Sequence, residues 1–168
     1  MLDGLLLFYV GAVLSLNGLW LLGRIADREI VVIDTAVGVI AAAVAARLAL
    51  GAGASADSIR GAALTLLFAI TYLWIVHNRL VAVDGRGLGW FSLFVALSLL
   101  PVSAQKIAGA SGAFETWLAV SWLIWAGLWF MYFLLAQGWL GARATGWAAL
   151  ATGITTGWLP GLALMGYL

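Results

Sequence analysis

The sequence has no cysteine, which excludes disulfides, cysteine-based metal sites and thiol catalysis. Its single histidine, His77, leaves little chemistry for a transition-metal site, and no metal, cofactor or catalytic residue is predicted. Charged residues make up only 9% of the 168 residues, whereas soluble domains contain about 25%. An ordinary soluble domain is therefore excluded. The net charge of +1 also excludes a nucleic-acid partner bound by phosphate neutralisation.

Hydrophobic residues, by contrast, make up 65% of the chain and form long stretches between short charged turns. Stretches of about 20 apolar residues are long enough to cross a bilayer as helices. The N-terminal stretch carries Asp3 and no basic segment, so it is predicted to be a helix and not a cleaved signal. The sequence predicts an all-α integral membrane protein with a single six-helix domain, residues 1–168. The expected spans are approximately 4–23, 30–50, 61–81, 87–105, 116–137 and 144–166.

The distribution of Lys and Arg predicts the orientation in the membrane, because these residues favour cytoplasmic loops. The loops after the first, third and fifth spans carry five basic residues, and the two other loops carry three. Both termini are therefore expected outside the cytoplasm. The five are Arg24, Arg28, Arg79, Arg86 and Arg143, and the three are Arg47, Arg60 and Lys106.

The region 116–142 is rich in tryptophan and free of formal charge. Trp117 and Trp139 would lie roughly 33 Å apart along a helix, as expected for residues at the two membrane interfaces. Trp122, Trp125 and Trp129 lie between them at positions i, i+3 and i+7, on one helix face. These three indoles either pack between helices or line a pathway.

The centres of the spans lack charged residues, apart from Asp34 near the start of the second span. An uncharged path of aromatic and hydroxyl groups cannot replace the hydration shell of an ion. A conducting path would therefore suit a small, polar, uncharged solute. Phe68 and Tyr72 share one face of the third span, beside Thr71 and Trp74, and could form a slot for a planar molecule with the three indoles. The alternative is that these aromatic residues only pack the bundle.

Three other features have simpler interpretations. Asp34 lies about one turn inside its span, so an intramembrane role competes with contact to the lipid headgroups. His77 could sense pH but is expected to be an ordinary interfacial residue. Gly85, Gly87 and Gly89 are expected to form an interhelical turn, because a phosphate-binding loop requires a preceding strand.

The last predicted span also carries a packing signal. Gly153, Gly157 and Gly161 recur every four residues, which permits close approach of another helix. Pro101 and Pro160 lie inside spans, where proline kinks or locally opens a helix.

Short motifs spread over the whole chain together resemble the AmiS/UreI family of urea channels and short-chain amide transporters. They are Tyr9-Val10-Gly11, Asn17-Gly18, the stretch 67–74 (LFAITYLW), Asp84-Gly85-Arg86, the stretch 90–95 (WFSLFV), the tryptophan-rich region 116–142 and Trp158-Leu159-Pro160.

The resemblance implies a six-helix protomer with its own pore, assembled as a homohexamer in the bacterial inner membrane. It implies passive passage of urea or short-chain amides, linked to a cytoplasmic urease or amidase. It also implies that Trp122, Trp125 and Trp129 line the path from the fifth helix, and Phe68 and Tyr72 from the third.

Two departures from the family pattern concern gating. Thr152 stands in the pore position where acid-gated urea channels have a buried glutamate, and the loop 106–115 is short and lacks histidine. The prediction is therefore a passive facilitator without acid gating. The alternatives are an ion-coupled amide transporter that uses Asp34, or a structural or sensory subunit. An enzyme is not expected, because no nucleophile–base pair occurs in the spans.

Overall fold

The computed structural model describes residues 2–168, and within that range the chain is helical without strands. Five long helices are followed by three short segments that succeed one another without a break, from Ala142 to Leu164. The elements are α1 (Leu2–Leu21), α2 (Ile30–Leu50), α3 (Ala56–Val81), α4 (Arg86–Gly109), α5 (Ala113–Ala136), α6 (Ala142–Thr152), the π-helix η1 (Gly153–Trp158) and α7 (Leu159–Leu164).

The helices α1 to α5 are each long and apolar enough to cross a membrane, which confirms an all-α integral membrane protein. The described limits differ most from the expected spans at the start of α3, which begins at Ala56 and not at residue 61. The cause is a capping box: Ser55 Oγ accepts from the Ser58 amide, and Ser58 Oγ accepts from the Ser55 amide. This cap adds a polar first turn outside the apolar stretch.

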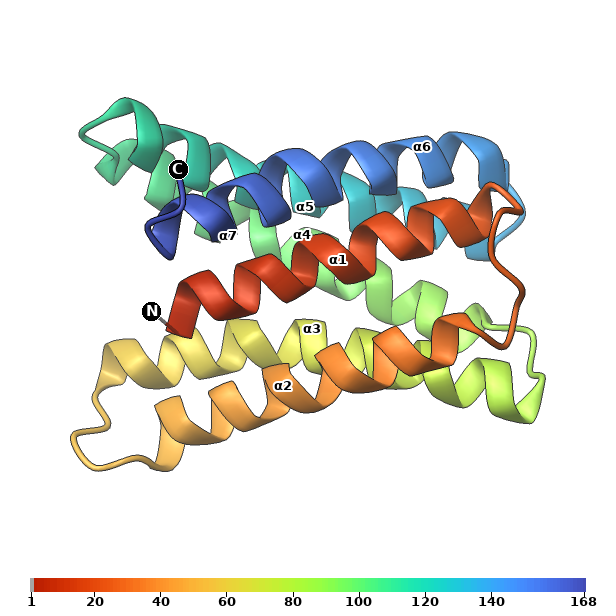
Figure 1. The fold of residues 1–168 in the computed structure, drawn as a ribbon, viewed down its shortest axis with the longest axis horizontal. Helices are drawn as coiled ribbons and strands as arrows, with labels where there is room; N and C mark the ends of the chain where they lie inside the picture. Colours follow the sequence, from red (N-terminus) through yellow and green to blue (C-terminus); the bar gives the residue numbers. More distant parts are fainter. Residues whose placement is uncertain (1) are drawn as a thin grey trace.

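The helices form a closed ring. Each packs against its neighbours in the chain, and α1 closes the ring by packing against α2 on one side and α6, η1 and α7 on the other. Figure 1 shows the helix axes roughly aligned with the long axis of the molecule, and both ends of the chain lie at the same end of the molecule. A closed ring of antiparallel helices has an inner face that lipid does not reach.

The distribution of side chains agrees with this arrangement. Large apolar residues such as Trp90, Phe94 and Leu97 are each 59% exposed on the outside of the ring. Polar residues, in contrast, are buried, among them Asn17 and Asp34, which are 1% and 0% exposed. An apolar exterior with polar groups inside is the arrangement expected of a bundle surrounded by lipid.

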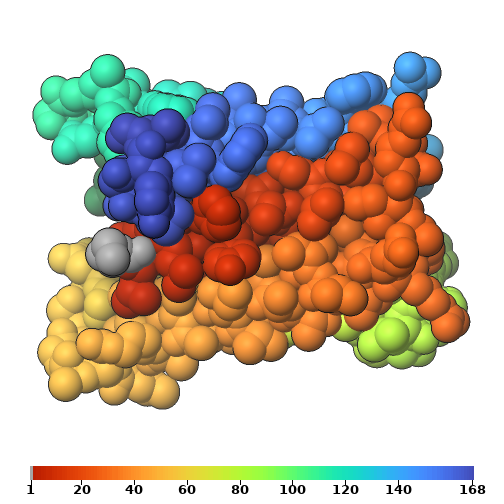
Figure 2. Space-filling view, in the orientation of Figure 1, coloured from red at the N-terminus to blue at the C-terminus, as the bar shows by residue number. Residues whose placement is uncertain are grey.

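The contact between α1 and the last segments is unusually close. A Cβ added at Gly157 would lie 2.5 Å from Gly11 Cα, and one added at Gly161 would lie 2.6 Å from the Phe8 amide nitrogen. The glycine ridge therefore lets two backbones touch. We call this contact the glycine seam, formed by Gly11 and Phe8 of α1 with Gly153, Gly157 and Gly161. Figure 2 shows α1 lying between these segments and α2 on one face of the molecule.

The two prolines have different effects. Pro101 lies inside α4, which stays helical from Arg86 to Gly109. Pro160 follows the π-helix Gly153–Trp158 at a distance of two residues. Because proline has no N–H and clashes with the preceding turn, a locally widened turn just before it is expected. The expected local opening thus occurs at Pro160.

Candidate functional site

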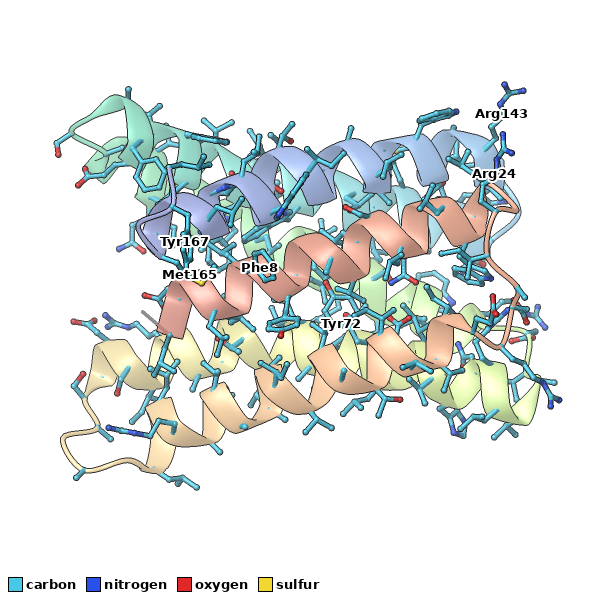
Figure 3. The ribbon with its side chains drawn as sticks, in the orientation of Figure 1. Phe8, Arg24, Tyr72, Arg143, Met165 and Tyr167 are labelled. Carbon is cyan, nitrogen blue, oxygen red and sulfur yellow. The ribbon has the colours of Figure 1, made fainter. Side chains whose placement is uncertain are left out.

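Three cavities follow one another through the ring. A cavity of about 480 Å³ lies at the end that holds the termini, with Asp3, Lys106 and Leu164 among its lining residues. A cavity of about 240 Å³ lies at the opposite end, with Trp20 and Arg79 in its wall. Figure 3 shows Arg24 and Arg143 at this opposite end, far from Met165 and Tyr167.

A third cavity of only about 20 Å³ lies between the two large ones. It shares four lining residues with the 240 Å³ cavity, namely Ile75, Leu88, Ser92 and Tyr132. We call it the central cavity. It has room for about one water molecule.

An aromatic cluster separates the central cavity from the 480 Å³ cavity. The Phe68 ring meets three indoles edge to face, with centroid distances of 6.5 Å to Trp122, 5.2 Å to Trp125 and 4.8 Å to Trp129. Phe68, Trp122 and Trp125 line the 480 Å³ cavity, whereas Trp129 and Tyr72 line the central one. The cluster therefore forms the partition between two cavities, and we call it the aromatic partition.

The structure thus brings together five of the six predicted pathway residues. Thr152 lies apart: it is buried at the end of α6 and lines none of the three cavities, while its carbonyl accepts from Thr156 Oγ1 at 2.7 Å. Its role in the pathway, like that of the other five, stays a prediction.

Two of the three indole N–H groups of the partition are bound within the protein. Trp125 Nε1 donates to Thr156 Oγ1 at 2.8 Å, and Trp129 Nε1 donates to Thr71 Oγ1 at 3.2 Å. Each threonine hydroxyl donates in turn to a carbonyl four residues back in its own helix. These bonds fix the orientation of the two rings, so the rings contribute apolar surface and not free donors to the cavities.

The free polar atoms belong to other residues. Asn17 Nδ2 donates to Asp34 Oδ1 at 3.1 Å, and both side chains are buried. Asn17 Oδ1, Asp34 Oδ2 and the Tyr72 hydroxyl have no hydrogen-bond partner among the described residues. Figure 3 shows Tyr72 about midway along the molecule. Contact of Asp34 with the lipid headgroups was therefore a wrong alternative, because Asp34 is fully buried against α1.

Sequence reasoning did not select Asn17 as a site residue. Its partner Asp34 is 17 positions away in the chain, and no local pattern links the two. The available signal was a single amide side chain in the middle of an otherwise apolar span.

The mouth at the Arg79 end is held by a small polar network. Arg79 pairs with Asp27 at 3.0 Å, its guanidinium lies 5.2 Å from the Trp20 ring centroid, and Trp20 Nε1 donates to Asp27. Burial by itself raises the pKa of Asp27, but hydrogen bonds from Arg79 and Trp20 and the Arg79 charge lower that pKa below its usual value. At the other mouth, Lys106 Nζ lies 5.2 Å from the Trp122 ring centroid.

No group of three His, Asp or Glu side chains that could hold a metal ion occurs within residues 2–168. The features that are present are a ring of apolar helices, a line of cavities through it and an aromatic partition across that line. Together they define a membrane transport protein.

The chain belongs to the AmiS/UreI transporter family, whose sequence profile matches residues 1–167. This membership confirms the resemblance and the prediction that the protein is not an enzyme. The chain is 42% identical to a putative amidate substrates transporter protein of Mycolicibacterium smegmatis, over 98% of this chain and 76% of that one. It is 31% identical to the acid-activated urea channel of Helicobacter pylori, over 94% of each. The crystal structure of the Helicobacter pylori urea channel matches with a TM-score of 0.85 at 31% identity, over 100% of both chains.

Proposed function

We propose that the protein is a passive channel for urea or short-chain aliphatic amides, with its pathway inside the ring of helices. The observation that carries the proposal is the line of three cavities, whose narrow central member has no charged residue in its wall. Removing the hydration shell of an ion in such a cavity costs far more than removing water from a neutral amide. The names of the related proteins support the same class of solute.

The aromatic partition supports selection by shape. The passing solute would have to enter between the Phe68 ring and the indoles of Trp125 and Trp129, which stand 4.8 to 5.2 Å from it. A planar molecule separates these rings less than a bulky one. Urea and acetamide are both planar and differ little, so hydrophobic contacts alone would separate them by roughly 1–3 kcal/mol.

The proposed molecule is a single membrane domain with six spans, in which α6, η1 and α7 together form the sixth. Each protomer would hold one pore, and a homohexamer in the bacterial inner membrane is proposed by analogy with the family. Both termini would lie outside the cytoplasm, since the opposite end carries five of the eight basic residues. The pore would supply a cytoplasmic urease or amidase.

The channel is further proposed not to be acid-gated. Thr152 offers no titratable group in the last span, and the loop between α4 and α5 has no histidine. Permeation should therefore change little between about pH 5 and 7.5. A several-fold rise in urea uptake at the lower pH would contradict this part of the proposal.

The deciding experiment is stopped-flow light scattering of proteoliposomes under gradients of urea, acetamide and glycerol. Fast entry of the two planar amides and slower entry of glycerol is expected. Trp125→Ala and Trp129→Ala should change that selectivity. Proteoliposomes no more permeable than empty vesicles would refute the proposal.

An ion-coupled amide transporter is the second candidate, favoured by the buried Asp34 carboxyl group. Against it, Asp34 lines none of the three cavities and is bound to Asn17. Asp34→Asn distinguishes the two: coupled transport would lose accumulation against a gradient, whereas a passive channel shows no accumulation before or after the change.

A further inference from the structure

Two polar atoms without a partner line the central cavity. Asn17 from α1 and Tyr72 from α3 both contribute to its wall, and both are about 1% exposed. Asn17 Oδ1 and the Tyr72 hydroxyl each lack a hydrogen-bond partner among the described residues. The Thr71 and Ser92 hydroxyls in the same wall donate to carbonyls of their own helices. Buried polar groups are normally paired, so two open groups in one cavity indicate a binding site.

In the structure the Asn17 amide nitrogen faces Asp34, because Nδ2 donates to Asp34 Oδ1 at 3.1 Å. Asn17 Oδ1 has no partner among the described residues, so it is the atom offered to the cavity. Asp34 does not line the cavity itself and acts as a positioning residue.

We propose that Asn17 and Tyr72 bind the H₂N–C=O group of the passing solute, an inference that rests on the proposed function. Asn17 Oδ1 accepts an N–H of the solute, and the Tyr72 hydroxyl donates to its carbonyl oxygen. One acceptor and one donor in the wall of the same cavity match the amide group, which carries a donor and an acceptor.

This site would supply hydrogen bonds to the solute, which the Trp125 and Trp129 indoles cannot supply. The N–H groups of Trp125 and Trp129 are already bound to threonine hydroxyls, so these two rings can select only by shape. Asn17 and Tyr72 would supply hydrogen bonds to the solute in the central cavity, on the other side of these rings. A solute would thus be selected by its shape at the aromatic partition and by its hydrogen-bonding groups at the central cavity.

The test compares urea with thiourea, which share their shape and N–H donors, while sulfur is the weaker acceptor. Fluxes through proteoliposomes of the full chain are measured for the wild type and Tyr72→Phe. Loss of the hydroxyl should lower urea flux about five-fold, the factor that one neutral hydrogen bond provides. Thiourea flux should fall less, so that the urea-to-thiourea ratio drops at least two-fold. Because the hydroxyl has no partner in the protein, Tyr72→Phe leaves the fold intact.

The second arm removes the acceptor. Asn17→Leu is combined with Asp34→Leu, because replacing both members of a buried polar pair avoids leaving one unpaired. Both solutes should slow by a similar factor, and their ratio should stay at the wild-type value. Tyr9→Phe, on α1 but outside all three cavities, is the matched control and should change neither flux.

The outcomes separate this inference from the proposed function. Wild-type vesicles that are tight to both solutes would refute the channel itself. A conducting wild type whose ratio is unchanged in Tyr72→Phe, or whose two fluxes fall equally there, would overturn the binding site alone. If the double variant does not fold, the Tyr72→Phe ratio decides the question by itself.

Discussion

The glycine seam and the aromatic partition join helices in opposite ways. In the seam, the backbones of α1 and the last segments touch, and a Cβ at Gly157 would lie 2.5 Å from Gly11 Cα. In the partition, Phe68 of α3 meets the indoles of α5 at centroid distances of 4.8 to 6.5 Å. Touching backbones cannot move aside, whereas the Phe68 side chain, which has no hydrogen bond, can change its rotamer. The bundle therefore has one contact between backbones, which is rigid, and one contact between side chains across the ring, which can adjust.

The largest expected effect on stability comes from a substitution in the glycine seam. Gly157→Leu would drive a side chain into the α1 backbone, which cannot move aside. We expect destabilisation of about 3 kcal/mol or more, with reduced yield of folded protein. Thermal unfolding in detergent measures the change.

Gly127→Leu is the matched control for this substitution. Gly127 lies on the exposed face of α5, and a Cβ there meets nothing within 4 Å. The control should unfold at or above the wild-type temperature, because a helical glycine is itself unfavourable by about 1 kcal/mol. Equal losses in the two variants would show that the seam does not depend on close backbone contact.

Phe68→Ala breaks the contact between side chains, and its effect is expected on selectivity. It removes three edge-to-face contacts, worth about 0.5–1.5 kcal/mol each, and widens the passage between the neighbouring cavities. The enlarged gap should admit glycerol, so the urea-to-glycerol flux ratio should fall several-fold. If Phe68→Ala vesicles kept the wild-type ratio, selection by shape would have to occur elsewhere.

A smaller effect is expected from the bond that orients one indole. Trp125→Phe removes the donor to Thr156 and should destabilise the protein by about 1 kcal/mol. Thr156→Val should cost a similar amount, and the double variant should cost less than the sum of the two. Thermal unfolding of the four proteins forms a double-mutant cycle. Strict additivity would mean that the bond contributes nothing.

The smallest effect concerns the exposed mouth. The pKa of Asp27 is lowered in the folded state below its usual value of 3.8. Its stabilising contribution is therefore complete above that value and is lost as pH falls through the lower, folded-state pKa. Because the Asp27 side chain is 62% exposed, this contribution is at most about 1 kcal/mol. Stability measured against pH should decline less below about pH 4 in Asp27→Asn than in the wild type.

Much of this architecture follows from the sequence because charged residues mark the ends of the helices. The predicted limits of the second span, 30–50, coincide with α2. The start of α3 was missed because a two-serine cap extends the helix beyond the apolar stretch. Gly153, Gly157 and Gly161 were predicted to permit close approach, but only the structure shows that α1 is the helix they touch.

The candidate site was predictable where helical periodicity determines it. Trp122, Trp125 and Trp129 share a face, so one ring from α3 can contact all three. The role of the indole N–H groups was not predictable, because Thr71 lies 58 positions from Trp129 and Thr156 lies 31 from Trp125. Asn17 was missed for the same reason, since long-range hydrogen bonds leave no periodic signal.

The π-helix η1 has a geometric consequence for the three glycines. In an α-helix, residues four apart overshoot a full turn by about 40°, so a run of such residues spirals around the axis. A π-helix holds more residues per turn, and the same spacing falls short of a full turn. Because η1 covers the first glycine interval and α7 begins within the second, the two rotations oppose each other. All three glycines therefore face α1, and deleting one residue of η1 would rotate Gly161 about the helix axis by about 100°, away from Phe8.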